Sequence, residues 1–408
     1  MIRTIEIENY KSIESASFEL GRINVFIGEN GAGKSNLLEA LSLLSAAAAD
    51  KLDNEYLYSR GVRVTAPQLM SCQLQDGSDS NPIIISATPI DSEKLSYEFT
   101  HDNKAYANWS FTFKKDGLGA DEFQIKRFDK YVKSEIPDEE QLNKQIFEFI
   151  TAAQLVAESL QKQKPIDKST YEKNHITSIF RSISKEFEVI PNELKEFLIY
   201  SPEQSSLRAF DPEGQIQPLG VQGEGLLKLV TVLYNEDKAA ITTIKESLQV
   251  LGWFSDFTVH DGTSSAPPKL EIFDKFIEGS IKSFDQKSAN EGFLFLLFYY
   301  ALFSSALTPK FFAVDNIDAS LNPKLCMMLI KQLVKISEKS GKQAILTTHN
   351  PAILDGLNLE DDEQRLFVIS RSLKGQTRIK RIEKPKDSNL KLSEMFMRGV
   401  LGGLPKDF

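Results

Sequence analysis

The chain has 408 residues, a hydrophobic content of 41% and a formal net charge of −9 at pH 7. This composition is ordinary for a globular protein with a real hydrophobic core, and no apolar run is long enough for a membrane-spanning helix. The acidic balance gives no support for nucleic-acid binding, which would need a local basic patch. The 2 cysteines exclude a disulfide framework and fit a reducing cytoplasm.

The first segment that carries chemistry follows a predicted strand. Residues 1–27 alternate between apolar and polar side chains and predict two or three strands, the last of them over 22–27. Residues 28–35 then match the phosphate-loop pattern G-x-x-x-x-G-K-[ST] at every fixed position, and a helix is predicted over 36–49. Strand, loop and helix together predict an ATP site formed by Gly28, Glu29, Asn30, Gly31, Ala32, Gly33, Lys34 and Ser35.

Each part of this loop has its own task in binding ATP and Mg²⁺. Backbone N–H groups and the helix N-terminus would surround the β-phosphate. Lys34 would reach the β- and γ-phosphates, and the Ser35 hydroxyl would ligate Mg²⁺. Arg60 and Arg63 follow the helix, and either could contact the nucleotide in its own chain. The more common role of an arginine on a connecting loop is that of a surface charge.

The middle of the chain changes character twice. Residues 82–128 alternate again between turn signals, which predicts an antiparallel meander. Within them, residues 123–130 mix basic and aromatic side chains; these could face nucleic acid, but a solvated strand face is the favoured interpretation. Residues 138–198 contain no glycine and predict a helical insertion. A glycine-rich stretch over 219–226 could form a second phosphate loop, but a tight turn before a helix is the favoured interpretation.

The last third of the chain carries the other half of a nucleotide site. Residues 311–315 form an apolar strand that ends in Asp315, the pattern in which an aspartate holds Mg²⁺ through water. A helix over 324–340 and a strand over 344–349, ending in His349, are predicted to follow. Strand, helix and strand predict a parallel unit in one sheet with the phosphate loop, so all three strand ends would meet at one ligand.

Four further segments carry a resemblance to a known family: residues 9–12, 288–292, 318–323 and 347–351. The order of the phosphate loop and these segments along the chain resembles that in the ABC-type ATPase heads of the SMC, RecF and OLD proteins. It is most similar to the stand-alone OLD-type AAA ATPases of bacterial anti-phage defence systems. The resemblance covers both ends of the chain and leaves out the helical middle.

The resemblance implies an α/β fold, an ABC-type P-loop ATPase head with an antiparallel β lobe and a helical insertion. Residues 1–135 would form the N-terminal part of the head, with the Walker A loop and the β lobe. Residues 136–200 would form the insertion. Residues 201–408 would form the C-terminal part, with the signature, Walker B, D-loop and switch histidine.

The resemblance also implies roles for single residues. Ser35 and Asp315 would hold Mg²⁺, and Asp315, Asn316 and His349 would form the catalytic group. In this family ATP lies between two heads, and the signature segment reaches the γ-phosphate held by the partner subunit. Beyond the phosphate loop, the implied cofactor-binding residues are Lys11, Asn36, Ser288, Asn290 and Gly292.

Three departures from the family pattern change the expected chemistry. The usual Leu-Ser-Gly-Gly signature is replaced by a degenerate run over 287–291, and the sequence stops without the Toprim domain of OLD nucleases. Asn316 stands where a glutamate usually acts as general base; asparagine can position water but cannot take its proton. Asp318 or Glu291 could supply a substitute carboxylate, although turn shaping and helix capping are their more common roles.

The sequence therefore predicts a cytoplasmic ATPase that dimerises and hydrolyses ATP slowly. By resemblance it would be the sensor or scaffold of an anti-phage complex, with a separately encoded nuclease or toxin as effector and no membrane partner. Two alternatives stay open. One is a RecF-like DNA-repair ATPase, and the other is a scaffold that binds ATP without hydrolysing it.

Overall fold

The computed structural model describes residues 1–72, 81–101, 109–116, 190–209, 218–260, 269–278, 283–383 and 390–404. The segment over 123–130 and residues 136–189 of the expected insertion lie outside these ranges. All described elements except the bend at Ile190 belong to one compact unit of the chain. No helix within the described ranges is both long and apolar enough to cross a membrane.

A six-stranded sheet forms the centre of this unit. Its strand order is β14-β13-β3-β12-β11-β7, and every neighbouring pair is parallel except β13 and β14. Strands β3, β11 and β12 are buried along their whole length, as expected for parallel strands covered on both faces. The strands are β3 (Ile23–Ile27), β7 (Ile199–Tyr200), β11 (Phe311–Val314), β12 (Gln343–Thr348), β13 (Gln364–Arg371) and β14 (Thr377–Ile382).

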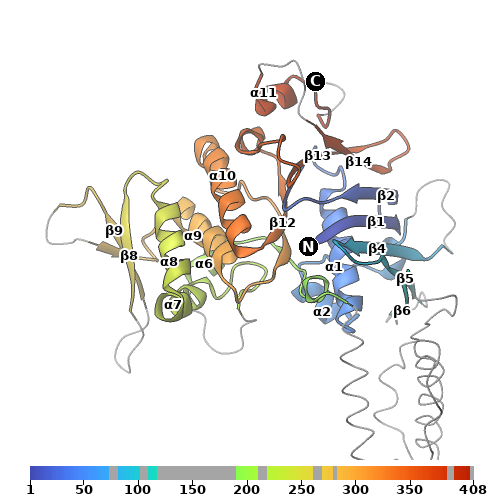
Figure 1. Cartoon of the computed structure of the whole chain (residues 1–408), viewed down its shortest axis with the longest axis horizontal. Coiled ribbons are helices and arrows are strands. Elements are labelled where there is room, and N and C mark those ends of the chain that lie inside the picture. Colours follow the sequence, from blue (N-terminus) through green and yellow to red (C-terminus); the bar gives the residue numbers. More distant parts are fainter. Residues whose placement is uncertain are drawn as a thin grey trace, which may run out of the picture. The chain divides into compact units, whose positions relative to one another are not determined.

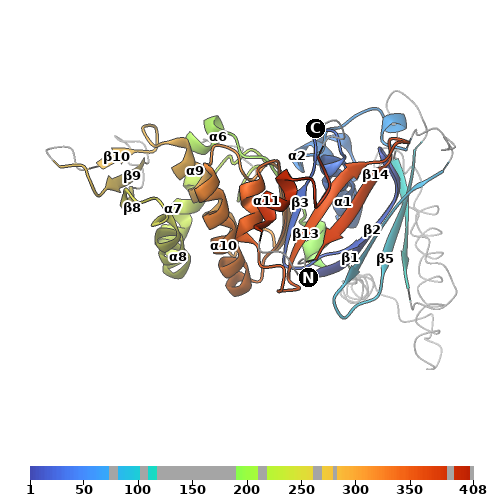
Figure 2. The same cartoon turned by 90° about the horizontal axis from the view of Figure 1, so that it is seen from above.

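Helices cover both faces of this sheet. Helix α1 (Lys34–Ala48) lies on the face toward β1 and β4, whereas α9 (Glu291–Ser304) and α10 (Pro323–Ser340) cover the other face, as Figures 1 and 2 show. Helix α9 is apolar all round, and its residues from Phe293 to Phe303 are at most 3% exposed. A helix of this kind can exist only inside a core.

A second sheet packs beside α1 and is antiparallel throughout. Its order is β2-β1-β4-β5-β6, which confirms the predicted meander as far as residue 115. The two sheets are joined by the buried side chain of Gln343, whose amide bonds both backbone groups of Ile2 and the carbonyl of Gly21. The strands are β1 (Ile2–Tyr10), β2 (Ile13–Glu19), β4 (Ile83–Pro89), β5 (Leu95–His101) and β6 (Trp109–Lys115).

The remaining elements are smaller. Strands β8 (Phe254–His260), β9 (Lys269–Asp274) and β10 (Ser283–Asp285) form a three-stranded antiparallel sheet that precedes α9. The glycine-rich stretch over 219–226 is a turn that leads into α7, as predicted. The short helices are α2 (Asn54–Ser59), η1 (Pro67–Leu69), α5 (Asn192–Lys195), α6 (Gln204–Arg208), α7 (Leu226–Glu236), α8 (Lys238–Leu248), η4 (Pro351–Gly356) and α11 (Leu392–Met397).

Candidate functional site

The phosphate loop joins β3 to α1 at the carboxyl edge of the central sheet. Gly31 and Gly33 have positive φ angles of 77° and 107°, which L side chains rarely adopt. A Cβ atom at Gly33 would lie 2.1 Å from the Thr377 hydroxyl, so only glycine fits there. The predicted helix begins two residues earlier than expected, at Lys34, which places Lys34 and Ser35 in its first turn.

Lys34 is folded back onto its own loop. Its Nζ donates to the carbonyl oxygens of Gly28, at 2.8 Å, and Glu29, at 3.0 Å, and the side chain is 6% exposed. Burial lowers the pKa of Lys34 to about 8, against the opposing charges of Asp315, Asp318 and Glu29. The ammonium group therefore lacks a full counter-charge, which an anionic ligand would supply.

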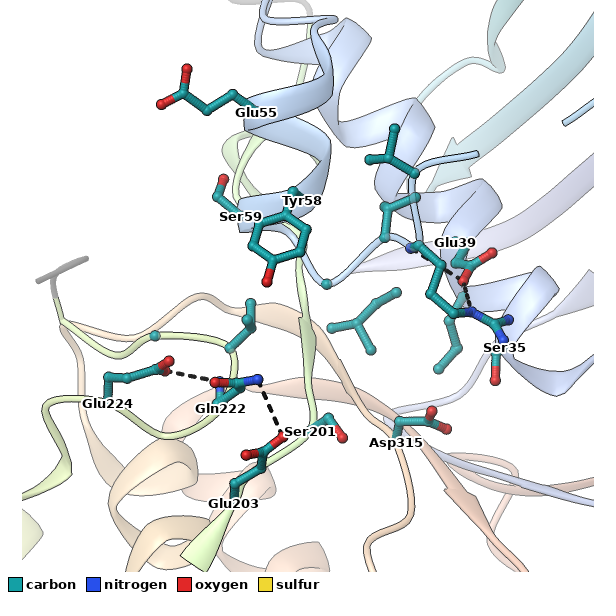
Figure 3. Close-up of a pocket in the computed structure, with 18 residues that line it drawn as sticks. Ser35, Glu39, Glu55, Tyr58, Ser59, Ser201, Glu203, Gln222, Glu224 and Asp315 are labelled. Atoms are coloured by element: carbon teal, nitrogen blue, oxygen red, sulfur yellow. Dashed lines mark hydrogen bonds and ion pairs between the residues drawn. The ribbon is translucent and has the colours of Figure 1, made fainter. Parts of the chain in front are cut away.

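Asp315 follows β11 and is fixed by its neighbours on both sides. Its backbone N–H donates to Tyr200 at 2.8 Å, and its carboxylate accepts a hydrogen bond from the Thr347 hydroxyl. Asp315 and Ser35 line the same cavity of about 1090 Å³, and Figure 3 shows both side chains at it. A carboxylate and a hydroxyl are oxygen donors of the kind Mg²⁺ takes, so these two residues would hold the ion beside phosphate oxygens and water.

His349 directly follows β12 and lies close to Lys34. Burial lowers the pKa of His349, and the charge of Lys34 lowers it further, against Asp318, Asp315 and a hydrogen bond with Gly28. The lowered pKa favours the neutral imidazole, which donates a hydrogen bond through one ring nitrogen and accepts one through the other. The strand ends carrying the phosphate loop, Asp315 and His349 do meet at one edge of the sheet, as the sequence predicts.

Asn316 has the left-handed backbone conformation, with φ at 53°. Asparagine adopts this conformation more readily than glutamate does. Its N–H donates to Thr347 Oγ1 at 2.9 Å. The two candidate substitute carboxylates are both hydrogen-bonded: Asp318 accepts from Thr348 Oγ1 at 2.6 Å, and Glu291 accepts from Ser320 Oγ at 2.9 Å. The expected helix cap of α9 is Asn290 and not Glu291, which instead bonds the loop at Ser320.

Lys11 and Asn36, both predicted to bind the cofactor, each contact a neighbouring protein group. Lys11 forms an ion pair with Glu39, which is 2% exposed, and Asn36 Nδ2 donates to Ser12 Oγ at 2.7 Å. These contacts join the turn between β1 and β2 to helix α1. The structure thus gives both residues a supporting position behind the phosphate loop.

The signature segment lies apart from the phosphate loop within one chain. Asn290 caps α9 by accepting a hydrogen bond from the N–H of Phe293 at 2.8 Å, and Ser288 is hydrogen-bonded to Asp285. Asn290 and Gly292 line a second cavity of about 480 Å³, together with Ser320 of the predicted D-loop, residues 318–323. None of the three predicted signature residues lines the cavity that holds Ser35 and Asp315.

Sequence reasoning missed two hydroxyl groups that shape the site. Thr347 bonds both Asp315 and the N–H of Asn316, and it was visible only as part of the Thr-Thr-His strand end. Thr377 Oγ1 donates to the carbonyl of Ala32 at 3.0 Å, although Ala32 is 345 residues away in the sequence. The same atom lies 2.7 Å from Ser12 Oγ, which is 365 residues away. No local pattern could have indicated Thr377.

Residues 23–355 match a family model, AAA_21, described as "AAA domain, putative AbiEii toxin, Type IV TA system". The chain belongs to the AAA_21 family. This places it among the ABC-type ATPases and agrees with the α/β, P-loop fold that the sequence predicts.

Shorter stretches of this AAA_21 chain resemble curated proteins. It is 39% identical over 64 residues to the DNA replication and repair protein RecF of Phocaeicola vulgatus, covering 15% of the chain and 17% of that protein. It is 42% identical over 64 residues to the DNA double-strand break repair Rad50 ATPase of Sulfurisphaera tokodaii, covering 15% of the chain and 7% of that protein. The chain thus spans less than a fifth of either relative.

A solved structure extends the likeness of the AAA_21 chain to the whole fold. An SMC head bound to the C-winged helix domain of ScpA matches with a TM-score of 0.54 at 12% sequence identity, covering 94% of this chain and 98% of that one. At such low identity the match shows the fold alone, and that fold is the ABC-type head.

Proposed function

We propose that this protein binds ATP with Mg²⁺ and that a second copy of the chain completes the site. The observation that carries the proposal is the meeting of the phosphate loop, Asp315 and His349 at one edge of the central sheet. When bound, ATP supplies the phosphoryl group and Mg²⁺ neutralises its charge. Lys34 would leave the carbonyls of Gly28 and Glu29 to bind the β- and γ-phosphates.

The arrangement supports slow hydrolysis. Thr347 holds the Asp315 carboxylate, so the metal-binding oxygens are positioned before ligand arrives. Asn316 can hold a water but offers no carboxylate to take its proton, and a positioned general base typically contributes about 10²–10⁴-fold to rate. A long-lived ATP complex suits a sensor or clamp better than a motor. Asn316 equally favours the alternative of a scaffold that does not hydrolyse at all.

The separation of the two half-sites supports the proposed dimerisation. Asn290 and Gly292 open onto one cavity, and Ser35 and Asp315 onto another. The signature segment can therefore contact ATP only if that ATP is held by another molecule. A head-to-head pair of this chain provides such an arrangement by symmetry.

For the cellular role, we propose an ATP-dependent sensor or scaffold of an OLD-like anti-phage system, acting with a separately encoded effector. The family description supports a two-component system, since it names a toxin and a toxin–antitoxin system. The identities to RecF and Rad50 favour a second candidate, a DNA-repair ATPase. A nuclease or toxin gene beside this one would support the first role, and ATP-dependent DNA binding by the purified protein would support the second.

Isothermal titration calorimetry with Mg²⁺ and ATP tests the nucleotide site. Lys34→Ala should abolish binding, because the substitution removes the cation for the β- and γ-phosphates. Lys335→Ala is the matched control, since it removes one lysine charge from the exposed face of α10 and should leave binding unchanged. Unchanged affinity in Lys34→Ala would refute the phosphate-loop assignment.

A further inference from the structure

The cavity at the phosphate loop has an acidic edge, formed by Glu55, Glu203 and Glu224. All three side chains line this cavity of about 1090 Å³, and Figure 3 shows them on the side away from Ser35. Glu203 and Glu224 accept hydrogen bonds from Gln222, at 3.2 and 2.9 Å. Within the described part of the chain, none of the three carboxylates forms an ion pair with a lysine or arginine. The acidic edge is therefore free to meet a cation from another molecule.

Glu203 is the member of this edge that is best placed for such a contact. It is exposed, and among described residues only Gln222 donates to its carboxylate, at the Oε1 atom, which leaves Oε2 open. Glu224 is half-buried, and its Oε2 atom accepts from the backbone N–H of Gln222, so it stabilises the turn before α7. Glu55 lies exposed in the first turn of α2 and adds to the negative charge of the edge.

The cavity at the signature segment, of about 480 Å³, has the opposite charge. Among its described lining residues Lys324 is the only charged one, and it is exposed in the first turn of α10. Lys287, at the start of the degenerate signature run, is also exposed. Neither ammonium group forms an ion pair with a described residue. The carboxylates of Asp285 and Glu291, in the same segment, are hydrogen-bonded to serine hydroxyl groups.

The proposed pairing of two copies brings these two cavities opposite each other. The signature segment of one copy would lie over ATP held beside Ser35 of the other. Lys324 shares its cavity with Asn290 of that segment, and Glu203 shares its cavity with Ser35. Contact at the nucleotide therefore sets Lys324 of one copy against the acidic edge of the other, and two-fold symmetry repeats the contact.

The net charge of the chain opposes self-association. Each copy carries a formal net charge of −9, so two identical copies repel each other at long range. Opposite charges on the two meeting faces offset that repulsion locally. They also disfavour other arrangements, because an acidic edge set against a second acidic edge would place like charges together.

We propose that Lys324 of one copy forms an ion pair with Glu203 of the other, on both sides of the two-fold axis, and that this contact fixes which faces of the two copies meet. Lys287 adds positive charge opposite the same acidic edge. The inference rests on the proposed pairing around ATP and extends it, since it assigns a contact outside the nucleotide by which the chain selects a second copy of itself.

Analytical ultracentrifugation with Mg²⁺ and a non-hydrolysable ATP analogue measures the dissociation constant of the pair. Glu203→Lys alone and Lys324→Glu alone should each raise it by about 10- to 100-fold, because both contacts in such a pair then join like charges. An equimolar mixture of the two variants restores opposite charges at both contacts, so its dissociation constant should return to within about 3-fold of wild type. Lys335→Glu, the same charge change about three turns further along α10, should alter pairing by less than about 3-fold.

The mixture separates contact between copies from effects within one chain. Rescue needs two folded proteins, so it also excludes misfolding as the cause of the losses. Single variants that pair as tightly as wild type would overturn the proposal. So would a mixture that stays as weak as its components, the result expected if Lys324 contacts the nucleotide of the second copy and not Glu203.

Neutral variants replace the charge reversals if either of these does not fold. Glu203→Gln and Lys324→Gln should each weaken pairing, and their double variant should pair no more weakly than either single variant, because one contact is lost in all three. Losses that add fully in the double variant would overturn the proposal. A wild type that stays monomeric with the analogue would refute the proposed pairing around ATP itself.

Discussion

Binding of ATP should take up a proton at alkaline pH, because Lys34 changes its surroundings when phosphate arrives. In the structure burial lowers the pKa of Lys34 to about 8. A triphosphate beside the ammonium group favours the charged form and returns the pKa toward its ordinary value. Free protein with a neutral lysine must therefore bind a proton together with the nucleotide.

The size of the effect follows from that pKa. Free Lys34 would be about half protonated at pH 8 and about one-tenth protonated at pH 9, so ATP binding should take up about 0.5 and about 0.9 proton respectively. By the same linkage the apparent affinity should fall about tenfold between pH 7 and pH 9. The nucleotide itself contributes little in this range, because its terminal phosphate is already ionised.

Calorimetry in two buffers of different ionisation enthalpy measures the proton number directly. Lys34→Arg is the control for charge, since a guanidinium stays protonated throughout and should abolish the uptake even if it binds more weakly. Lys342→Met is the control for a second buried lysine and should leave the uptake unchanged. An uptake below about 0.2 proton at pH 9 would mean that Lys34 is already charged in the free protein, and the linkage argument would fail.

Three other outcomes are expected. Asn316→Glu should raise steady-state phosphate release, by at most about 10²–10⁴-fold. The same substitution should lower the free energy of unfolding by about 1 kcal/mol, because glutamate fits the left-handed backbone poorly. If the wild type already releases phosphate rapidly and Asn316→Glu does not raise the rate, another residue acts as the base. Light scattering should show ATP-dependent doubling of mass at micromolar protein, and a monomer with and without ATP would exclude the paired head. Lys342, 2% exposed and hydrogen-bonded to Thr308 and Pro309, has its pKa lowered by burial to about 7. The unfolded chain therefore binds more protons above that pH, so the urea midpoint should rise from pH 7 to pH 9, and Lys342→Met should reduce the rise.

The parts of the site that were predictable are those encoded by contiguous residues. Lys34 and Ser35 follow a strand and open a helix, and Asp315 and His349 each end a buried strand. Right-handed parallel connections then leave few ways to arrange those strands, so their ends had to converge. The central sheet could be anticipated for the same reason.

The parts that were not predictable depend on pairs far apart in the chain. The contacts of Arg60 and Arg63 differ because Arg60 donates to the carbonyl of Glu196, 136 residues away, while Arg63 donates to the carboxylate of Glu39. Strand β7 consists of only Ile199 and Tyr200, since only these two residues pair with β11. Such pairings are decided by tertiary packing, and the local sequence pattern does not indicate which distant residue or strand will be the partner.

The position of β3 has a consequence for how the protein is made. This strand leaves the ribosome long before its two neighbours in the sheet, β12, which begins at Gln343, and β13, which begins at Gln364. During most of translation the strand that carries the phosphate loop has both hydrogen-bonding edges open. Such late, long-range pairing slows folding and leaves an apolar strand exposed to aggregation. A nascent chain should therefore acquire ATP binding only after synthesis has passed β13, and a premature stop before that strand should yield a product that cannot bind nucleotide.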